Sequence, residues 1–295
     1  MRSTTRLPPA RLSQSELARY WSDLSRRHLD RADDGLSVIC YAGMPAWFNR
    51  FLDVYQRKAL GRLLQGADFS GKRVLDVGTG VGRWARWFAR WPGTQVVGID
   101  IEPLRLSAAR EHGGSITYLR MPVDKLAFPD ASFDVVSCVT VLQHVDADVK
   151  RDAVAEFSRV LKPGGLAVVF ELTDTKDDAR HVFPWSHDTW VAEFDRNDLC
   201  LVKAVGDQYT PLLRLLKAAY GLWRGPKARD SIDQTKRGSN SSFLLALLRP
   251  AVAVSYPMEE AARFLPSRLA RMTGFALRKA ETENRPPRRA GVWTA

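Results

Sequence analysis

The sequence has few cysteines and no long apolar run, and each absence excludes a class of protein. Its 295 residues contain only three cysteines, Cys40, Cys138 and Cys200. They form no CxxC pair, which argues against a disulfide framework and indicates a reducing compartment. The longest apolar stretch, residues 243–257, is interrupted by an arginine and a proline. It falls short of the roughly 18 residues that span a bilayer.

The N-terminal residues 1–11 are basic and lack the apolar core of a secretory signal. We therefore expect a cytoplasmic protein. Apolar residues make up 45% of the chain and charged residues 26%, a balance typical of globular proteins that excludes wholesale disorder and coiled coils. The length predicts one large domain, or one domain with a sizeable insertion.

The net charge of +11 is concentrated in the last third of the chain. Residues 201–295 hold 17 Lys and Arg against 7 Asp and Glu, whereas residues 1–200 are almost neutral. A basic segment favours phosphate-bearing partners such as nucleic acid, anionic lipid or a phosphorylated substrate. Compositional drift explains the same excess equally well, so both interpretations stay open.

Strands and helices are expected to alternate between residues 72 and 172. The expected strands are short, apolar and β-branched, which is typical of a doubly wound, mostly parallel α/β sheet. Two further strands follow, which gives seven in all. The expected strands are 72–78, 94–100, 115–121, 132–141, 166–172, 199–209 and 275–281. The expected helices are 11–31, 46–65, 81–91, 102–112, 146–161, 191–198 and 211–225.

This pattern divides the chain into four segments. Residues 1–71 are expected to form an N-terminal helical lid, and residues 72–209 the core. Residues 210–274 are expected to be a helical basic insertion, followed by the last strand and tail at 275–295. A lid is expected because the carboxyl ends of parallel strands form an open edge, from which water must be excluded during chemistry.

A glycine-rich loop, LDVGTGVG at 75–82, follows the first expected strand and precedes a helix. Glycine lets the backbone approach a ligand closely, and the helix offers free N–H groups. The third glycine of a dinucleotide-binding GxGxxG is replaced by Arg83, which argues against NAD or FAD. Asp76 adds an acceptor for a cationic amine.

The second expected strand ends in Asp100, 22 residues after Gly78. A carboxylate at this position can accept hydrogen bonds from both ribose hydroxyls of a nucleoside. An ordinary helix N-cap is the alternative role for Asp100.

Four segments resemble the class I S-adenosylmethionine-dependent methyltransferases, particularly the small-molecule group that includes the ubiquinone and menaquinone methyltransferases. They are VLDVGTGVGRW (74–84), VVGIDIEP (96–103), LAFPDASFDVVSCVTVLQHV (126–145) and EFSRVLKPGGLAVVFEL (156–172). The resemblance covers about residues 72–172. It implies a Rossmann-like fold and S-adenosyl-L-methionine as the cofactor.

The resemblance also implies which residues surround the cofactor. Asp76, Gly78 and Gly80 would surround its methionine part, and Asp100 would bind its ribose. The family often carries an acidic residue where this chain has Pro122, so either Asp124 or water is expected to bond the adenine amino group. The expected cofactor-binding residues are Asp76, Gly78, Gly80, Asp100, Ile101, Val123, Asp124 and Val139.

Methyl transfer to oxygen or nitrogen usually needs a base of near-neutral pKa. Ligands bind beyond the carboxyl ends of the strands, so the candidate bases are His144, Glu171 and His187. A structural role is the alternative for His144, and a surface loop is the alternative for His187. The cluster of His181, His187 and Asp188 is weak evidence for a metal, and we expect none.

These observations predict methyl transfer to an oxygen, or less favourably a nitrogen, of a small-molecule, sugar or lipid-linked metabolite. The chain lacks the Asn/Asp-Pro-Pro-aromatic and Pro-Cys turns of enzymes that methylate nucleobases. RNA ribose methylation through the basic C-terminal third and non-catalytic cofactor binding remain as alternatives. Peripheral contact with an anionic membrane is a further expectation, and the oligomeric state stays open.

Overall fold

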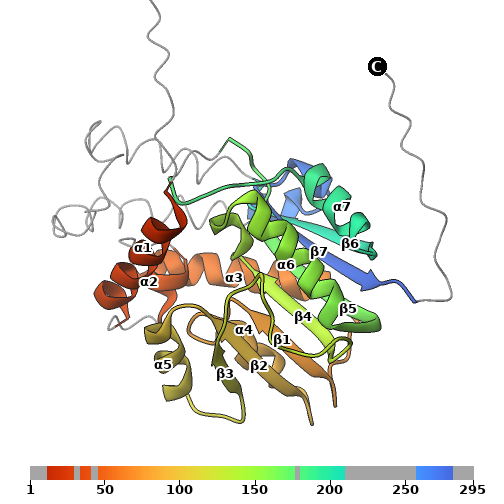
Figure 1. The fold of residues 1–295 in the computed structure, drawn as a ribbon. Helices are drawn as coiled ribbons and strands as arrows, with labels where there is room; N and C mark the ends of the chain where they lie inside the picture. Colours follow the sequence, from red (N-terminus) through yellow and green to blue (C-terminus); the bar gives the residue numbers. More distant parts are fainter. Residues whose placement is uncertain (1–11, 30–33, 41–45, 177–179, 210–256, 282–295) are drawn as a thin grey trace, which may run out of the picture.

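The computed structural model describes residues 12–29, 34–40, 46–176, 180–209 and 257–281. At its centre lies a seven-stranded sheet with the strand order β3-β2-β1-β4-β5-β7-β6 (Figure 1). The strands are β1 (Arg73–Val77), β2 (Gln95–Asp100), β3 (Thr117–Arg120), β4 (Phe133–Val139), β5 (Leu161–Leu172), β6 (Leu199–Asp207) and β7 (Met272–Lys279). The expected seven-stranded, mostly parallel sheet is therefore confirmed.

Strand β7 is the one strand that runs against the others. It pairs antiparallel with both β5 and β6, and its first residue, Met272, lies opposite Leu172 and Asp207. These two residues are the last residues of β5 and β6. The chain therefore enters β7 at the carboxyl edge of the sheet, the edge at which α/β folds bind their ligands.

Helices cover both faces of the sheet. On one face lie α3 (Ala46–Leu63), α4 (Arg83–Phe88) and α5 (Pro103–Glu111), and on the other lie α6 (Ala147–Val160) and α7 (His187–Arg196). Successive side chains of a strand point to opposite faces of the sheet. Val74 therefore packs on the face covered by α3, α4 and α5, and Leu75 and Val77 pack on the face covered by α6 and α7. Burial on both faces explains why these strands are continuously apolar.

Two short N-terminal helices, α1 (Gln14–His28) and α2 (Leu36–Ile39), lie beside α3 and α5 (Figure 1). The Ser13 side chain and the Glu16 side chain each accept a hydrogen bond from the other's backbone N–H, and this capping box starts α1. Helix α2 and the one-turn 3-10 helix η1 (Leu142–His144) are too short to show a periodic pattern in the sequence.

Helix α7 begins at His187, four residues before the expected start at 191. The reason is Ser186, whose side chain accepts a hydrogen bond from the Thr189 backbone N–H at 3.1 Å and caps the helix. The helix expected at 211–225 and most of the expected insertion lie outside the described residues.

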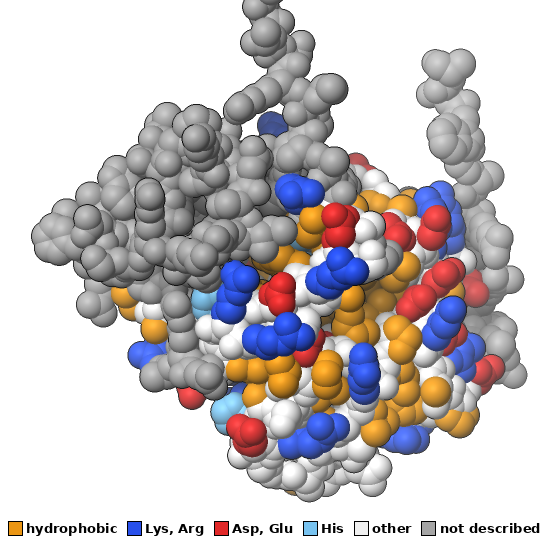
Figure 2. Space-filling model, turned by 60° about the vertical axis from the view of Figure 1, so that its left-hand side comes forward, with side chains coloured by type: hydrophobic (Ala, Val, Ile, Leu, Met, Phe, Trp, Pro, Cys, Tyr) orange, Lys and Arg blue, Asp and Glu red, His pale blue; other side chains and the backbone are white. Residues whose placement is uncertain are grey.

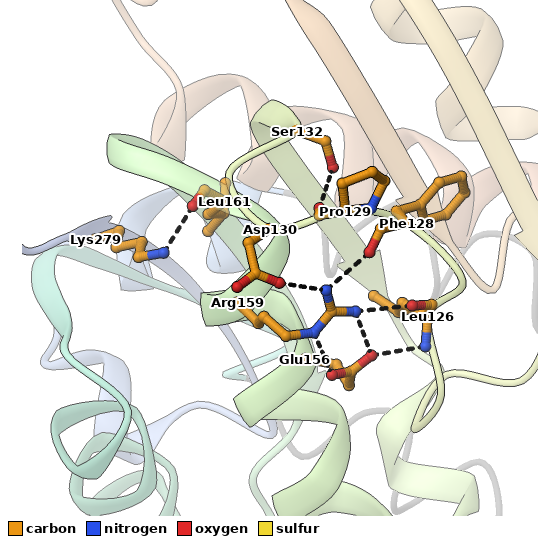
Figure 3. Close-up of polar contacts among 9 residues, drawn as sticks. All are labelled: Leu126, Phe128, Pro129, Asp130, Ser132, Glu156, Arg159, Leu161 and Lys279. Carbon is orange, nitrogen blue, oxygen red and sulfur yellow. Dashed lines mark hydrogen bonds and ion pairs between the residues drawn. The ribbon is translucent and has the colours of Figure 1, made fainter.

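The loop between β3 and β4 is fixed by one arginine of α6, Arg159 (Figure 3). Its guanidinium donates to the carbonyl oxygens of Leu126 and Phe128 at 2.7 and 2.8 Å. It also pairs with the carboxylates of Glu156 and Asp130 at 2.7 and 2.8 Å, which raise the pKa of the guanidinium further. This loop continues from Val123, so Arg159 also holds the backbone expected to face the adenine.

We predict that Arg159→Lys lowers the free energy of unfolding by about 1–2 kcal/mol, because an ammonium group cannot reproduce the planar set of donors. Urea denaturation measures this. Arg151→Lys is the matched control, since Arg151 pairs with the exposed Asp148 on the same helix and otherwise lies 6.0 Å from the Trp185 ring. That control should cost less than about 0.5 kcal/mol, and equal losses in the two variants would contradict the assignment.

Candidate active site

The glycine loop follows β1 and is bonded to the end of β2. Gly78 and Gly80 adopt left-handed φ angles of 65° and 55°. A Cβ at Gly78 would collide with Val141, and one at Gly80 would lie 2.9 Å from Ile39 Cγ2. The Gly80 N–H donates to Asp100 Oδ2 at 2.8 Å, and the Thr79 N–H donates to the Ile99 carbonyl oxygen at 2.8 Å. Glycine is therefore required here for both conformation and space.

Asp100 lies at the carboxyl end of β2 and is 8% exposed. Its second oxygen accepts a hydrogen bond from the Glu102 N–H at 2.9 Å. Each oxygen therefore has one backbone donor and keeps a second lone pair for another. The helix N-cap that was the alternative role for Asp100 is instead Glu102, whose side chain accepts from Leu104 N.

The residues expected around the adenine lie next to this carboxylate in the sheet. Ile101 directly follows Asp100 and is 44% exposed. Val123 is buried, while Asp124 is half-buried in the loop after β3. Val139, the last residue of β4, is buried in the core layer formed with α3, α4 and α5.

Asp76 lies beneath the glycine loop and is 1% exposed. It accepts a hydrogen bond from the Thr79 hydroxyl at 2.7 Å. Burial raises its pKa to about 6. Asp76 thus holds the shape of the loop from below.

Glu171, one of the three candidate bases, holds the turn that follows β4. Its carboxylate accepts three backbone hydrogen bonds, from Val141 and Leu142 to Oε1 at 3.0 and 2.8 Å and from Gln143 to Oε2 at 2.9 Å. The side chain is completely buried, which raises its pKa to about 7 despite these three bonds. Its geometry is that of a group that positions η1.

His144, the second candidate base, uses both ring nitrogens within the structure. Nδ1 lies 2.9 Å from the His181 carbonyl oxygen, so Nδ1 carries the proton. Nε2 then accepts a hydrogen bond from the Gln143 side-chain amide at 3.1 Å. Burial lowers the pKa of His144 to about 3, and the neighbouring His181, Arg105 and Lys150 act in the same direction. The imidazole is therefore neutral, with both nitrogens bonded.

His187, the third candidate, lies apart from the other two. It is the first residue of α7, its ring contacts that of Phe275 at 5.3 Å, and its Nε2 lies 3.4 Å from the Ser267 hydroxyl. Its Nδ1 pairs with Asp188 at 3.2 Å. Among the residues that the structure describes, no group of three or more His, Cys, Asp and Glu side chains is placed to hold a metal ion.

Four rings join α1 to the turn after β4. The rings of Tyr20 and His181 are stacked at 4.9 Å, and those of His181 and His144 at 5.5 Å. Trp21 contacts the edge of this stack, with its ring 4.7 Å from that of His144. The first helix thus lies directly over the carboxyl edge of the sheet, in the position that a cover would occupy.

Arg105, which the sequence analysis did not single out, completes this contact. It is 9% exposed, donates from Nε to the Ser25 hydroxyl at 3.0 Å and lies 5.0 Å from the Trp21 ring. Its Nη2 has no hydrogen-bond partner among the described residues. Burial lowers the pKa of Arg105, while the nearby carboxylates of Asp100 and Glu102 oppose that shift.

Arg83, which replaces the third glycine of a dinucleotide motif, has a structural role as well. Its guanidinium pairs with Asp53 at 2.9 Å and with the Gln56 side chain at 2.8 Å, both on α3. It is 5% exposed. In the sequence, the arginine in place of the third glycine of GxGxxG was the signal that could have indicated this link between the glycine loop and α3.

Two tryptophan residues that follow β5 lie in or against the core. Trp190 is completely buried, and its ring stacks with that of Phe194 at 5.5 Å. Trp185 packs against Trp190 at 4.8 Å. The aromatic residues near the carboxyl edge are instead Tyr20 and Trp21 of α1.

The site geometry fits S-adenosylmethionine on two observations. The loop at Gly78 and Gly80 presents bare backbone, because a side chain at either position would collide with its neighbours. Asp100, at the end of β2, keeps free lone pairs that can accept further hydrogen bonds. A methionine group can therefore approach the loop, and ribose hydroxyls can donate to the carboxylate. Residues 75–169 match the family model described as "Methyltransferase domain".

Curated relatives match part of the chain. The sterol 24-C-methyltransferase of Yarrowia lipolytica is 30% identical over 193 residues, covering 55% of this chain and 50% of that protein. The ubiquinone biosynthesis O-methyltransferase of Hahella chejuensis is 45% identical over 103 residues, covering 33% of this chain and 42% of that protein. This chain therefore spans half or less of the length of these relatives.

A solved structure shows the same fold at low identity. The phosphoethanolamine N-methyltransferase 2 of Haemonchus contortus, in complex with S-adenosyl-L-methionine, superposes with a TM-score of 0.53 and 19% identity over 87% of this chain and 60% of that chain. Sheet topology, glycine loop and family model agree on one assignment. Residues 75–169 thus match a methyltransferase domain, on a fold shared with solved methyltransferase structures.

Proposed function

We propose that this protein transfers the methyl group of S-adenosylmethionine to a small, lipid-like acceptor. The observation that carries the proposal is the bond between Gly80 and Asp100, which joins the glycine loop to an acidic strand end. Gly78 and Gly80 would lie against the methionine part and Asp100 would accept the ribose hydroxyls. Ile101, Val123 and Asp124 would surround the adenine, with Val139 behind the loop.

The reaction is an in-line displacement at a methyl carbon that the sulfonium of the bound cofactor makes reactive. Since the leaving group is already good, the protein mainly has to orient the two reactants and exclude water. The described residues suit that task. The glycine loop, η1 and α1 meet at the carboxyl edge of the sheet, and each is held by buried hydrogen bonds or stacked rings.

An apolar, planar acceptor is supported by what surrounds this edge. Tyr20 and Trp21 contribute aromatic surface, and Val141 and Ile39 contribute aliphatic surface beside the glycine loop. The names of the relatives agree, because a sterol and ubiquinone are both lipid-like ring compounds. We propose an oxygen of such a compound as the acceptor atom. The relative named as a sterol C-methyltransferase favours carbon as a second candidate.

The bonding of His144 and Glu171 bears on how the acceptor loses its proton. Glu171 accepts three backbone hydrogen bonds and both ring nitrogens of His144 are bonded, so we assign these two groups to positioning η1 and α1. An acidic acceptor hydroxyl such as a phenol, with a pKa of about 10, needs a weaker base than an alcohol does. His187 remains a candidate base for an acceptor that extends towards β7.

The proposal is tested by incubating the protein with methyl-tritiated S-adenosylmethionine and fractionated cell extract. We expect label in the lipid or small-molecule fraction, with the product's methyl position assigned by NMR. Label in RNA alone would favour ribose methylation and contradict the proposal. Cofactor binding with no label in any fraction would favour a non-catalytic role.

We predict that Gly80→Ala weakens binding of S-adenosylmethionine at least about tenfold, because the new Cβ would lie 2.9 Å from Ile39 Cγ2 and would displace the loop against which the methionine part lies. Gly113→Ala is the matched control, since Gly113 has a similar φ of 69° and a Cβ there meets nothing within 4 Å. Both variants carry the same backbone strain, so isothermal titration isolates the effect of position. Equal affinities in the two variants would contradict the assignment of the pocket.

A pH-dependent stability is predicted from His144. Its pKa is about 3 in the folded protein and about 6.5 when unfolded, so between these values the unfolded chain binds the extra proton. Stability from this group is present above about pH 6.5 and is lost as the pH falls. From about pH 7 to about pH 5, the native protein should lose about 1–2 kcal/mol more than His144→Gln.

Chemical denaturation at a series of pH values measures this difference. The buried carboxylates contribute the opposite slope, but they are common to both proteins and cancel. His112→Gln, at an exposed position, should keep the pH dependence of the native protein. Parallel curves for the native protein and His144→Gln would show that His144 is not held neutral.

A further inference from the structure

An exposed apolar segment, residues 258–269, precedes β7; it comprises the end of a short helix (257–262), a bend and the 3-10 helix η3 (Ser267–Leu269), and is called the turn below. Within residues 258–269, four large apolar side chains are solvent-exposed, whereas most other exposed large apolar residues among those described are scattered. Their exposed fractions are 56% for Met258, 80% for Phe264, 49% for Leu265 and 62% for Leu269. A cluster of this kind marks an interaction surface.

The backbone of this turn is fixed, so the side chains are held outwards. The Leu265 N–H donates to the Ala262 carbonyl oxygen at 2.9 Å, and the Leu265 carbonyl oxygen accepts from the Tyr209 hydroxyl at 3.0 Å. The Ser267 carbonyl oxygen accepts from the Ala270 N–H at 3.0 Å. Phe264 is thus presented on a built turn, and no described element covers it.

Cations flank the apolar side chains. The Arg263 guanidinium lies 4.8 Å from the Phe264 ring, and Arg268 is exposed two residues beyond Pro266. Both acidic residues of the segment are engaged in the structure: Glu260 pairs with Lys58 at 3.5 Å and with Arg263 at 3.4 Å, and Glu259 accepts from the Tyr209 N–H. Arg268 is the exposed cation next to Leu269.

The wider charge distribution points the same way. The turn belongs to the part of the sequence, residues 201–295, that carries 17 basic against 7 acidic residues. By contrast, Lys and Arg are interspersed with Asp and Glu over the face shown in Figure 2. None of the described helices is long and apolar enough to cross a membrane, so contact through this turn would be superficial.

The turn also lies at the edge of the sheet that holds the cofactor loop. Met272, directly after it, pairs with the last residues of β5 and β6. The Ser267 hydroxyl lies 3.4 Å from His187 Nε2, and the Thr173 N–H donates to the Arg271 carbonyl oxygen at 3.0 Å. A surface bound at this turn would face the carboxyl edge of the sheet.

We propose that residues 258–269 dock the protein on an anionic membrane surface, with Phe264 and Leu269 entering the headgroup region and Arg263 and Arg268 contacting lipid phosphates. Apolar side chains flanked by cations are the combination that binds such interfaces. A lipid-like acceptor could then pass from the bilayer to the carboxyl edge. The docking itself does not depend on which acceptor is methylated.

Flotation of the full chain with vesicles tests the proposal. We expect binding to phosphatidylcholine vesicles that contain phosphatidylserine, weaker binding to phosphatidylcholine alone, and weakening by salt. Phe264→Ser with Leu269→Ser should reduce the bound fraction about tenfold. The matched control is Leu201→Ser with Val202→Ser, because Val202 on β6 is also 62% exposed but lies outside the turn. That control should bind as the native protein does.

Three outcomes would overturn the proposal. The native protein could fail to bind either vesicle at low salt. The Phe264→Ser, Leu269→Ser variant could bind as well as the native protein, which would place membrane contact elsewhere on the chain. Finally, sedimentation without lipid could show that this variant converts a dimer into a monomer, which would identify the turn as a contact between two copies. Circular dichroism confirms that each variant is folded.

Discussion

The hydrogen bond from the Gly80 N–H to Asp100 Oδ2 joins the two parts of the structure on which the site depends. The glycine loop alone is only a bend after β1, and Asp100 alone is only a carboxylate at the end of β2. Bonded together, they form one surface: the glycine loop supplies backbone without side chains, and Asp100 supplies lone pairs that can accept hydrogen bonds. The parallel pairing of β1 with β2 places their ends side by side and makes the bond available.

The second constraint is the turn after β4, which is built from buried polar groups that satisfy one another. Glu171 receives three backbone N–H groups, and His144 bonds to the His181 carbonyl oxygen and the Gln143 amide. Removing one member would leave the others buried and unpaired, which is costly. A site that works by orientation needs such fixed surroundings, and we propose this role for the two groups that resemble bases in the sequence.

The sheet could be predicted from the sequence because its signals are local. Buried strands such as 72–78 are short runs rich in β-branched residues, and the glycines after this strand mark the loop at 78–82. The antiparallel position of β7 between β5 and β6 could not be predicted, because it depends on pairing between distant segments. For the same reason, no local pattern indicates that Tyr20 and Trp21 contact His144 and His181. The cofactor side of the site is therefore local in sequence, and the acceptor side is assembled by tertiary contacts.

The most direct test of this account is a crystal structure of the protein with S-adenosylhomocysteine, the product left by the cofactor. The account predicts ribose hydroxyls within hydrogen-bond distance of Asp100, the amino-acid part against Gly78 and Gly80, and Ile101 on the adenine. A ligand bound elsewhere, or one whose ribose does not contact Asp100, would contradict the central claim that the bonded loop and strand end form the cofactor site.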